Sequence, residues 1–183
     1  MMYSGKLLNL FDKNKKNYKN YHKKMIFFLN IYIKLMINTK MTSKNISINI
    51  KDNFSGTALT YACLHNSIEI VELLLKNECD LNIGRTIKGN TALITACNND
   101  NIKIVKLLLE KNCNVNISND EGDTALLIAS RKGNSEIVKL LLEKECNLNI
   151  QNNYGYTALI VACKYNFVDI VKLLLSEKSK IDV

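Results

Sequence analysis

Six cysteines and two histidines are the side chains in this 183-residue chain best suited to metal or redox chemistry. Zinc sites use Cys and His at close spacing, commonly with a C-x-x-C pair. No such pair occurs, and His22 and His65 lie in different regions. The cysteines form two sets whose members are one or two periods of 33 or 34 residues apart: Cys63, Cys97 and Cys163, and Cys79, Cys113 and Cys146. We therefore predict free thiols at small-residue positions, no metal and no cofactor, and a reducing intracellular location, cytoplasmic or nuclear.

The sequence holds no recognisable catalytic constellation. It contains no glycine-rich phosphate loop, no H-E-x-x-H and no G-x-S-x-G. Acidic side chains are spread over helical segments and face lysines at helical spacing, as Glu136 does with Lys139. We predict a protein without enzymatic activity.

The dominant pattern is a four-fold recurrence of Thr-Ala-Leu. It begins at Thr57, Thr91, Thr124 and Thr157, so the spacings are 34, 33 and 33 residues. A fixed period of this size indicates a stack of structural repeats. Such stacks typically present a surface that holds another molecule.

Each Thr-Ala-Leu belongs to a longer unit whose residues suit a turn followed by two helices. In the third unit, Gly122 suits a turn with positive φ and Thr124 suits a helix N-cap. Ala129 and Ser130 are small enough for neighbouring helices to approach closely. The segment Glu136–Leu142 is apolar on most sides, as expected for a helix packed between repeats. One repeat cannot bury this apolar surface alone, so stacking must do it.

These matched positions closely resemble the ankyrin repeat, which consists of a β-turn followed by two antiparallel helices. The resemblance covers about residues 51–183 and implies an all-α solenoid of helix-turn-helix units with β-turn or hairpin loops. The four repeats would be 52–83, 84–117, 118–150 and 151–183. Ala replaces the family's proline after each Thr. Positive φ is expected at Asn66, Asp100, Gly133 and Asn166 after the first helices, and in question at Glu78, Asn112, Glu145 and Lys178 after the second.

The resemblance also implies a function, which is binding of other proteins on the concave side formed by turn tips and the ends of first helices. Carried over position by position, it gives the candidate partner-binding residues Phe54, His65, Lys88, Asn90, Asp123, Arg131, Tyr154, Tyr156 and Tyr165. Exposed aromatic residues and arginine are the types that dominate binding energy. The alternative is that these positions are merely tolerated surface residues.

The first 50 residues differ in charge from the rest. They hold ten lysines and one aspartate, a net charge of +9, whereas residues 51–183 carry 15 basic and 16 acidic residues, a net charge of −1. Residues 1–24 are expected to be a basic, disordered extension. The alternative is attachment to nucleic-acid phosphates or to an acidic membrane surface through residues 1–50.

Residues 25–50 are interpreted as a degenerate capping helix and linker at the start of the stack. The apolar stretch 25–37 is too short to span a bilayer, which takes about 20 residues. The segment Ile46–Ile50 aligns with Cys79–Ile83 of the first repeat. A helix lying on a membrane surface is the alternative.

The fourth unit remains apolar in its second helix, although a terminal repeat normally turns polar on its outer face. One interpretation is a fragment of a longer repeat array. The other is that another subunit covers this end, so self-association through the fourth repeat is a second candidate partnership.

Overall fold

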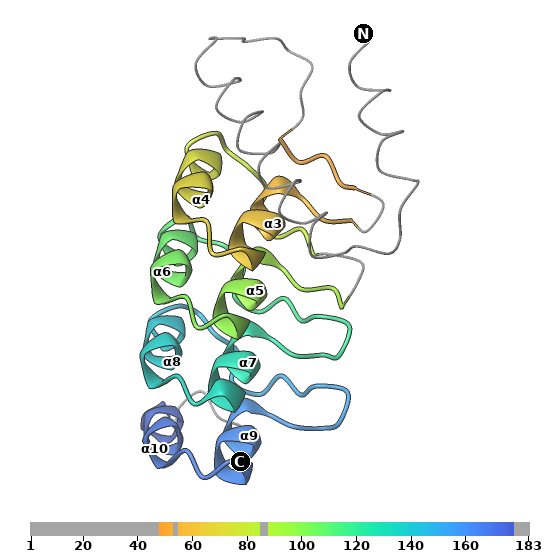
Figure 1. Cartoon of the computed structure of the whole chain (residues 1–183). Helices are drawn as coiled ribbons and strands as arrows, with labels where there is room; N and C mark the ends of the chain where they lie inside the picture. The colour runs from red at the N-terminus through yellow and green to blue at the C-terminus, as the bar shows by residue number, and fades with distance from the viewer. Residues whose placement is uncertain (1–47, 53–54, 85–87, 178–183) are drawn as a thin grey trace, which may run out of the picture. The chain divides into compact units, whose positions relative to one another are not determined.

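The computed structural model describes residues 48–52, 55–84 and 88–177, all within one compact unit that spans residues 46–183. In these ranges eight α-helices form two layers and no strand occurs (Figure 1). One layer holds the first helices, α3 (Ala58–Leu64), α5 (Ala92–Asn98), α7 (Ala125–Lys132) and α9 (Ala158–Lys164). The other holds the second helices, α4 (Ile68–Leu75), α6 (Ile102–Glu110), α8 (Ser135–Leu142) and α10 (Val168–Ser176).

Several predicted features lie outside the described residues. They are the basic extension (1–24), most of the predicted capping helix and linker (25–50), and the candidate site residue Phe54. Within the described part, four helical pairs follow one another with turns projecting to one side (Figure 1). The predicted all-α solenoid is confirmed.

A threonine caps each first helix, as the recurrence predicted. The Oγ1 atoms of Thr57, Thr91, Thr124 and Thr157 each accept a hydrogen bond at 3.3 Å from the backbone N–H three residues later. This bond satisfies one of the N–H groups that the helix itself leaves without a partner. Alanine follows every cap, at the position where the family has proline. Since alanine is a good helix former, each first helix begins without the proline.

The corner between the two helices of a repeat requires positive φ. The residues there have φ of 55°, 54°, 78° and 59°, in the order Asn66, Asp100, Gly133 and Asn166. Asn and Asp enter this region more readily than other residues with side chains. The prediction of left-handed geometry at these four corners is confirmed.

Gly133 stands apart from the other three corners because of what packs on it. At the first two corners, Asn66 and Asp100 accept side-chain hydrogen bonds from Asn101 and Asn134 of the following repeat. At the third corner the ring of Phe167 occupies that place, 2.8 Å from where a Cβ of Gly133 would lie. Glycine is therefore required by both the backbone and the neighbouring ring.

The position after the second helix is less uniform. Glu78 and Asn112 have φ of 53° and 54°, whereas Glu145 does not have positive φ. Lys178 lies outside the described residues. Glu78 therefore carries a strain of about 1 kcal/mol that Glu145 avoids.

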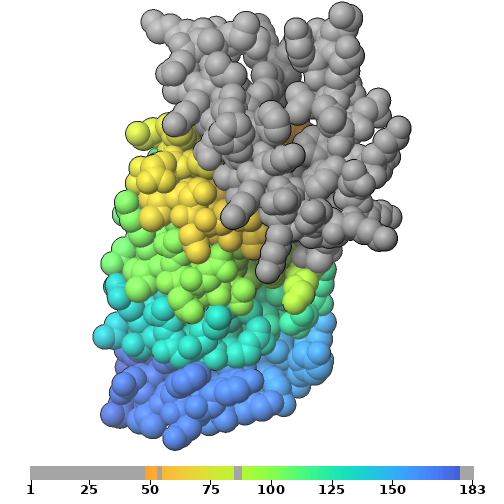
Figure 2. Space-filling view, in the orientation of Figure 1, coloured from red at the N-terminus to blue at the C-terminus, as the bar shows by residue number. Residues whose placement is uncertain are grey.

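The core lies between successive repeats, which pack directly on one another (Figure 2). Ile94 and Leu127 occupy one repeat position, and each side chain is 1% exposed. The equivalent Ile160 in the fourth repeat is 44% exposed, because no described residue covers it. Each interior repeat thus depends on its successor to remove its apolar surface from water.

An asparagine ladder runs along the stack beside the second helices. The Oδ1 atoms of Asn49, Asn82 and Asn116 each accept a hydrogen bond from a backbone N–H of the next repeat, at 2.7, 2.9 and 2.8 Å. Asn49 holds the place one repeat before Asn82, in agreement with the alignment of Ile46–Ile50 with Cys79–Ile83. The repeat register therefore extends to residues before the first helix pair.

All six cysteines are thiols and not disulfides, as predicted, and five of them are buried. Burial raises the pKa of Cys113 to about 11, and it raises the pKa values of Cys63, Cys79 and Cys97 above that of an ordinary thiol. Cys163 is exposed because it lies on the uncovered face of the fourth repeat. The expectation of buried thiols is therefore wrong at this one position.

We predict that a chromogenic thiol reagent labels one cysteine of the native chain quickly and all six after denaturation. The reactive species is the thiolate, which burial suppresses at the interior positions. The Cys163→Ser variant should lose the fast phase. Rapid labelling of two or more thiols in the native chain would contradict the packing described above.

We predict that Gly133→Ala lowers the free energy of unfolding by at least ~2 kcal/mol. The backbone contributes about 1 kcal/mol, and displacement of the Phe167 ring adds about the same or more. Urea denaturation measures the change. In a Phe167→Ala background the same substitution should cost only the backbone part, and equal costs in the two backgrounds would exclude the ring contact.

Candidate partner-binding site

A pocket of about 270 Å³ lies between α7 of the third repeat and the turn and first helix of the fourth repeat. We call it the aromatic pocket, and its lining residues are Arg131, Asn152, Tyr154, Tyr156, Val161, Lys164 and Tyr165. Four of the candidate residues, Arg131 and the three tyrosines, are thus brought together. They come from two repeats, so neither repeat forms the pocket alone.

Asn152 fixes the turn that carries two of the tyrosines. Its Oδ1 accepts hydrogen bonds from the backbone N–H groups of Tyr154 and Tyr156, both at 3.0 Å. Asp52 and Asn119 make the equivalent bond in the first and third repeats. Sequence reasoning missed this role, although the recurrence of Asp or Asn at one repeat position, followed by a turn, was the available signal.

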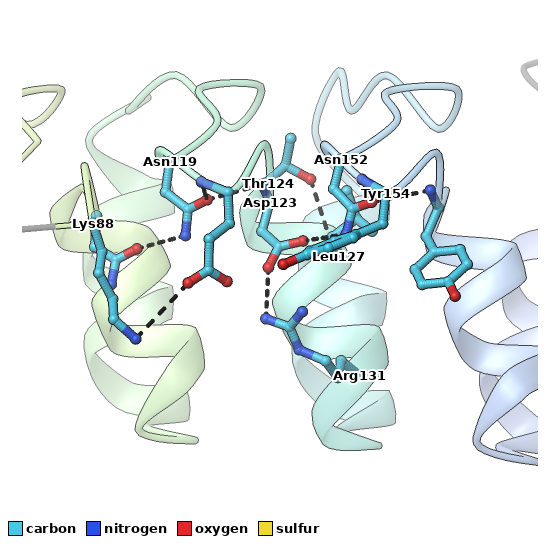
Figure 3. Close-up of polar contacts among 11 residues, drawn as sticks. Lys88, Asn119, Asp123, Thr124, Leu127, Arg131, Asn152 and Tyr154 are labelled. Carbon is cyan, nitrogen blue, oxygen red and sulfur yellow. Dashed lines mark hydrogen bonds and ion pairs between the residues drawn. The ribbon is translucent and has the colours of Figure 1, made fainter.

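Asp123 connects Asn152 to Arg131 (Figure 3). The Nδ2 of Asn152 donates to Oδ1 of Asp123 at 2.9 Å, and Nη2 of Arg131 donates to Oδ2 at 2.6 Å. The Asp123 side chain is 0% exposed, whereas that of Arg131 is 35% exposed. Asp123 was predicted to contact a partner, but its burial leaves it no surface for one. It positions the residues around it instead.

In the third and fourth repeats, a basic side chain of the first helix contacts the turn residue eight positions before it. Arg131 donates to Asp123, and Lys164 donates from Nζ to the Tyr156 hydroxyl at 3.2 Å. The Lys164 ammonium also lies 4.5 Å from the centroid of the Tyr156 ring, a cation–π distance. The hydrogen bond to Tyr156 raises the pKa of Lys164, so this side chain is a stable cation.

The exposed tyrosine rings of the pocket are held by neighbouring rings. Tyr154 is 74% exposed, and its ring lies 6.4 Å from that of Tyr156. Tyr165 is 48% exposed and stacks on Phe167 at 6.1 Å. Such aromatic pairs add roughly 0.5–1.5 kcal/mol each beyond the area they bury. The pocket therefore presents its rings in a fixed arrangement.

The remaining candidate residues lie outside the aromatic pocket. Lys88 forms an exposed ion pair with Glu121 at 3.9 Å, and Asn90 accepts a hydrogen bond from Asn119 at 2.8 Å (Figure 3). His65 ends α3 in the first repeat and is half-buried. Lys88 and Asn90 thus belong to the turn of the second repeat, and His65 lies at the far end of the first helix of the first repeat.

Backbone hydrogen bonds also join successive turns. The N–H of Asp120 donates to the Lys88 carbonyl, and the N–H of Asn153 donates to the Glu121 carbonyl, both at 3.0 Å. The second turn differs from its described neighbours in having two consecutive residues with positive φ, Lys88 and Gly89. Its preceding residues 85–87 lie outside the description.

Two further observations concern residues 48–52, 55–84 and 88–177. No group of three or more His, Cys, Asp or Glu side chains is arranged to hold a metal ion in that part of the chain. Among the same residues, none of the helices combines the length and the apolar character that crossing a bilayer requires.

We predict that Arg131→Ala lowers the free energy of unfolding by about 2–3 kcal/mol, because it leaves the buried Asp123 carboxylate without its cation. Adding Asp123→Asn should restore most of the loss. The second repeat has Asn90 at this position, and an amide oxygen can still accept from Asn152. Thermal denaturation compares the three variants. A double variant no more stable than Arg131→Ala would refute the account.

Comparison with known proteins places these features in a family. A family model described as ankyrin repeats in three copies matches residues 29–119 and residues 111–183. No curated protein matches the chain. The matched segments cover most of the sequence and include all eight described helices. The chain therefore belongs to the ankyrin repeat family.

Proposed function

We propose that this protein is a non-catalytic scaffold or adaptor that binds other proteins on the side formed by its turns and first helices. Ankyrin repeats generally mediate protein–protein interaction. The aromatic pocket is the observation that carries the proposal for this chain, because it gathers three tyrosines and one arginine on that side. Tyrosine and arginine are the residue types that contribute most to binding energy at protein interfaces.

The pocket is pre-organised for binding. The path from Arg131 through Asp123 and Asn152 fixes the backbone of Tyr154 and Tyr156 by hydrogen bonds of 2.6–3.0 Å. Ordering a flexible side chain at an interface costs about 0.5–1.5 kcal/mol. Rings that are already held lose less freedom when a partner binds, so more of the contact energy is retained as affinity.

The chemistry of the pocket supports binding over catalysis. Its functional groups are tyrosine hydroxyls, an ammonium, a guanidinium and a buried amide. General acid–base catalysis needs a group poised to gain and lose a proton near neutral pH. The pKa of Lys164 is raised by its hydrogen bond to Tyr156, so this ammonium stays protonated there, and Arg131 is engaged in an ion pair with Asp123.

The basic residues 1–50 offer a second mode of attachment, to nucleic acid or to an acidic membrane surface, since they carry a net charge of +9. Salt dependence separates the two modes. Attachment through lysine–phosphate contacts weakens steeply with salt. Binding through the tyrosine rings depends mainly on apolar burial and weakens less with salt.

We predict that Tyr154→Ala/Tyr156→Ala reduces recovery of protein partners in affinity capture by at least about tenfold, because two interface anchors are removed. Lys139→Ala/Glu143→Ala changes two exposed side chains on and beside α8, in the other layer, and should change recovery little. A chain of residues 41–183 should recover the same proteins as the full chain.

Two outcomes would contradict the proposal. The first is recovery by the tyrosine variant that equals that of the unmodified chain. The second is complete loss of recovery on deleting residues 1–40 combined with a steep salt dependence, which would favour attachment through the basic segment.

A further inference from the structure

The aromatic pocket contains a cation that has no acidic partner among the described residues. Six of the twelve basic side chains in the described ranges form ion pairs, and Arg131 of the pocket is one of them. Lys164 is among the other six, and its ammonium donates to the Tyr156 hydroxyl. An ammonium has three N–H donors, so Lys164 retains donor capacity at the mouth of the pocket.

Arg131 adds a second cation to the same lining. Its recorded contact with Asp123 uses one terminal nitrogen, whereas a guanidinium carries five N–H donors. The Asp123 carboxylate is itself fully buried and accepts from Asn152 and Arg131. The residues lining the pocket therefore include two cations and no carboxylate.

Apart from the amide of Asn152, the rest of the lining is aromatic or apolar. Tyr154, Tyr156, Tyr165 and Val161 supply rings and a branched side chain around the two cations. The volume of about 270 Å³ is just below the roughly 300–1,000 Å³ typical of sites for drug-sized ligands. This volume suits one or two side chains of a protein segment better than a whole cofactor.

We propose that the aromatic pocket binds an acidic segment of a protein partner. In this complex an Asp or Glu carboxylate of the partner contacts Lys164 and Arg131. An apolar side chain beside it packs against the rings of Tyr154 and Tyr165. The inference rests on the proposed protein-binding function and adds the chemical class of the partner.

The test must separate the pocket from the basic segment, because the +9 charge of residues 1–50 attracts any acidic peptide. Random peptides displayed on phage are selected on the full chain at physiological salt, and those that also bind Tyr154→Ala/Tyr156→Ala are discarded. The expected result is a set of peptides enriched in Asp or Glu next to Leu, Phe or Tyr.

A charge reversal then tests the contact itself. Lys164→Glu should weaken the selected peptides at least about tenfold, because like charges at a close contact are strongly unfavourable. Lys139→Glu is the matched control, since it makes the same change in net charge on an exposed residue of α8. It should change affinity by less than about twofold. Peptides with Lys in place of the acidic residue should bind Lys164→Glu better than they bind the unmodified chain.

Three results would overturn the inference, and they differ in what they leave standing. Pocket-dependent peptides that are neutral or basic would refute the acidic partner while leaving protein binding supported. Equal effects of the two charge reversals would show that the attraction is general and not local to Lys164. Failure to select any pocket-dependent peptide would count against the proposed function as well.

Discussion

The structure depends on burial of the apolar face of each repeat by the next one. Ile94 and Leu127 are almost completely buried, whereas the equivalent Ile160 is 44% exposed because no described repeat follows it. Each such side chain contributes about 1.5–3 kcal/mol when it is fully removed from water. This constraint explains the small residues at Ala129 and Ser130, which bring the first helices close enough for the apolar side chains to interlock.

Close stacking at a constant register makes cross-repeat hydrogen bonds possible. Equivalent residues of successive repeats lie next to one another in the stack, so the same type of hydrogen bond recurs between them. The ladder of Asn49, Asn82 and Asn116 is one example, and the Asn90–Asn119 and Asp123–Asn152 pairs at the turns are another. Each bond adds roughly 0.5–1.5 kcal/mol, so the ladders reinforce the register that apolar packing creates.

The candidate site arises from small departures within this regular framework. Where the second repeat has Asn90, the third has the charged Asp123, and Arg131 neutralises it eight residues later. The fourth repeat has Tyr156 and Lys164 at the same two positions, and they too are in contact. The framework fixes the place of these pairs and leaves their chemistry free to vary, so this surface can change without loss of the fold.

The local features of this chain follow from residue type alone. Threonine caps, the positive φ of Asn66 or Gly133 and the two-helix repeat depend on interactions within a few residues, which residue type controls directly. The packing of repeats on one another, and not residue type, buries Asp123 and lets Glu145 avoid the positive φ adopted by Glu78. The same packing brings Arg131 and Tyr165 into one pocket. These outcomes depend on contacts between repeats about 30 residues apart, and a repeat period shows which positions are equivalent without showing which side chains meet.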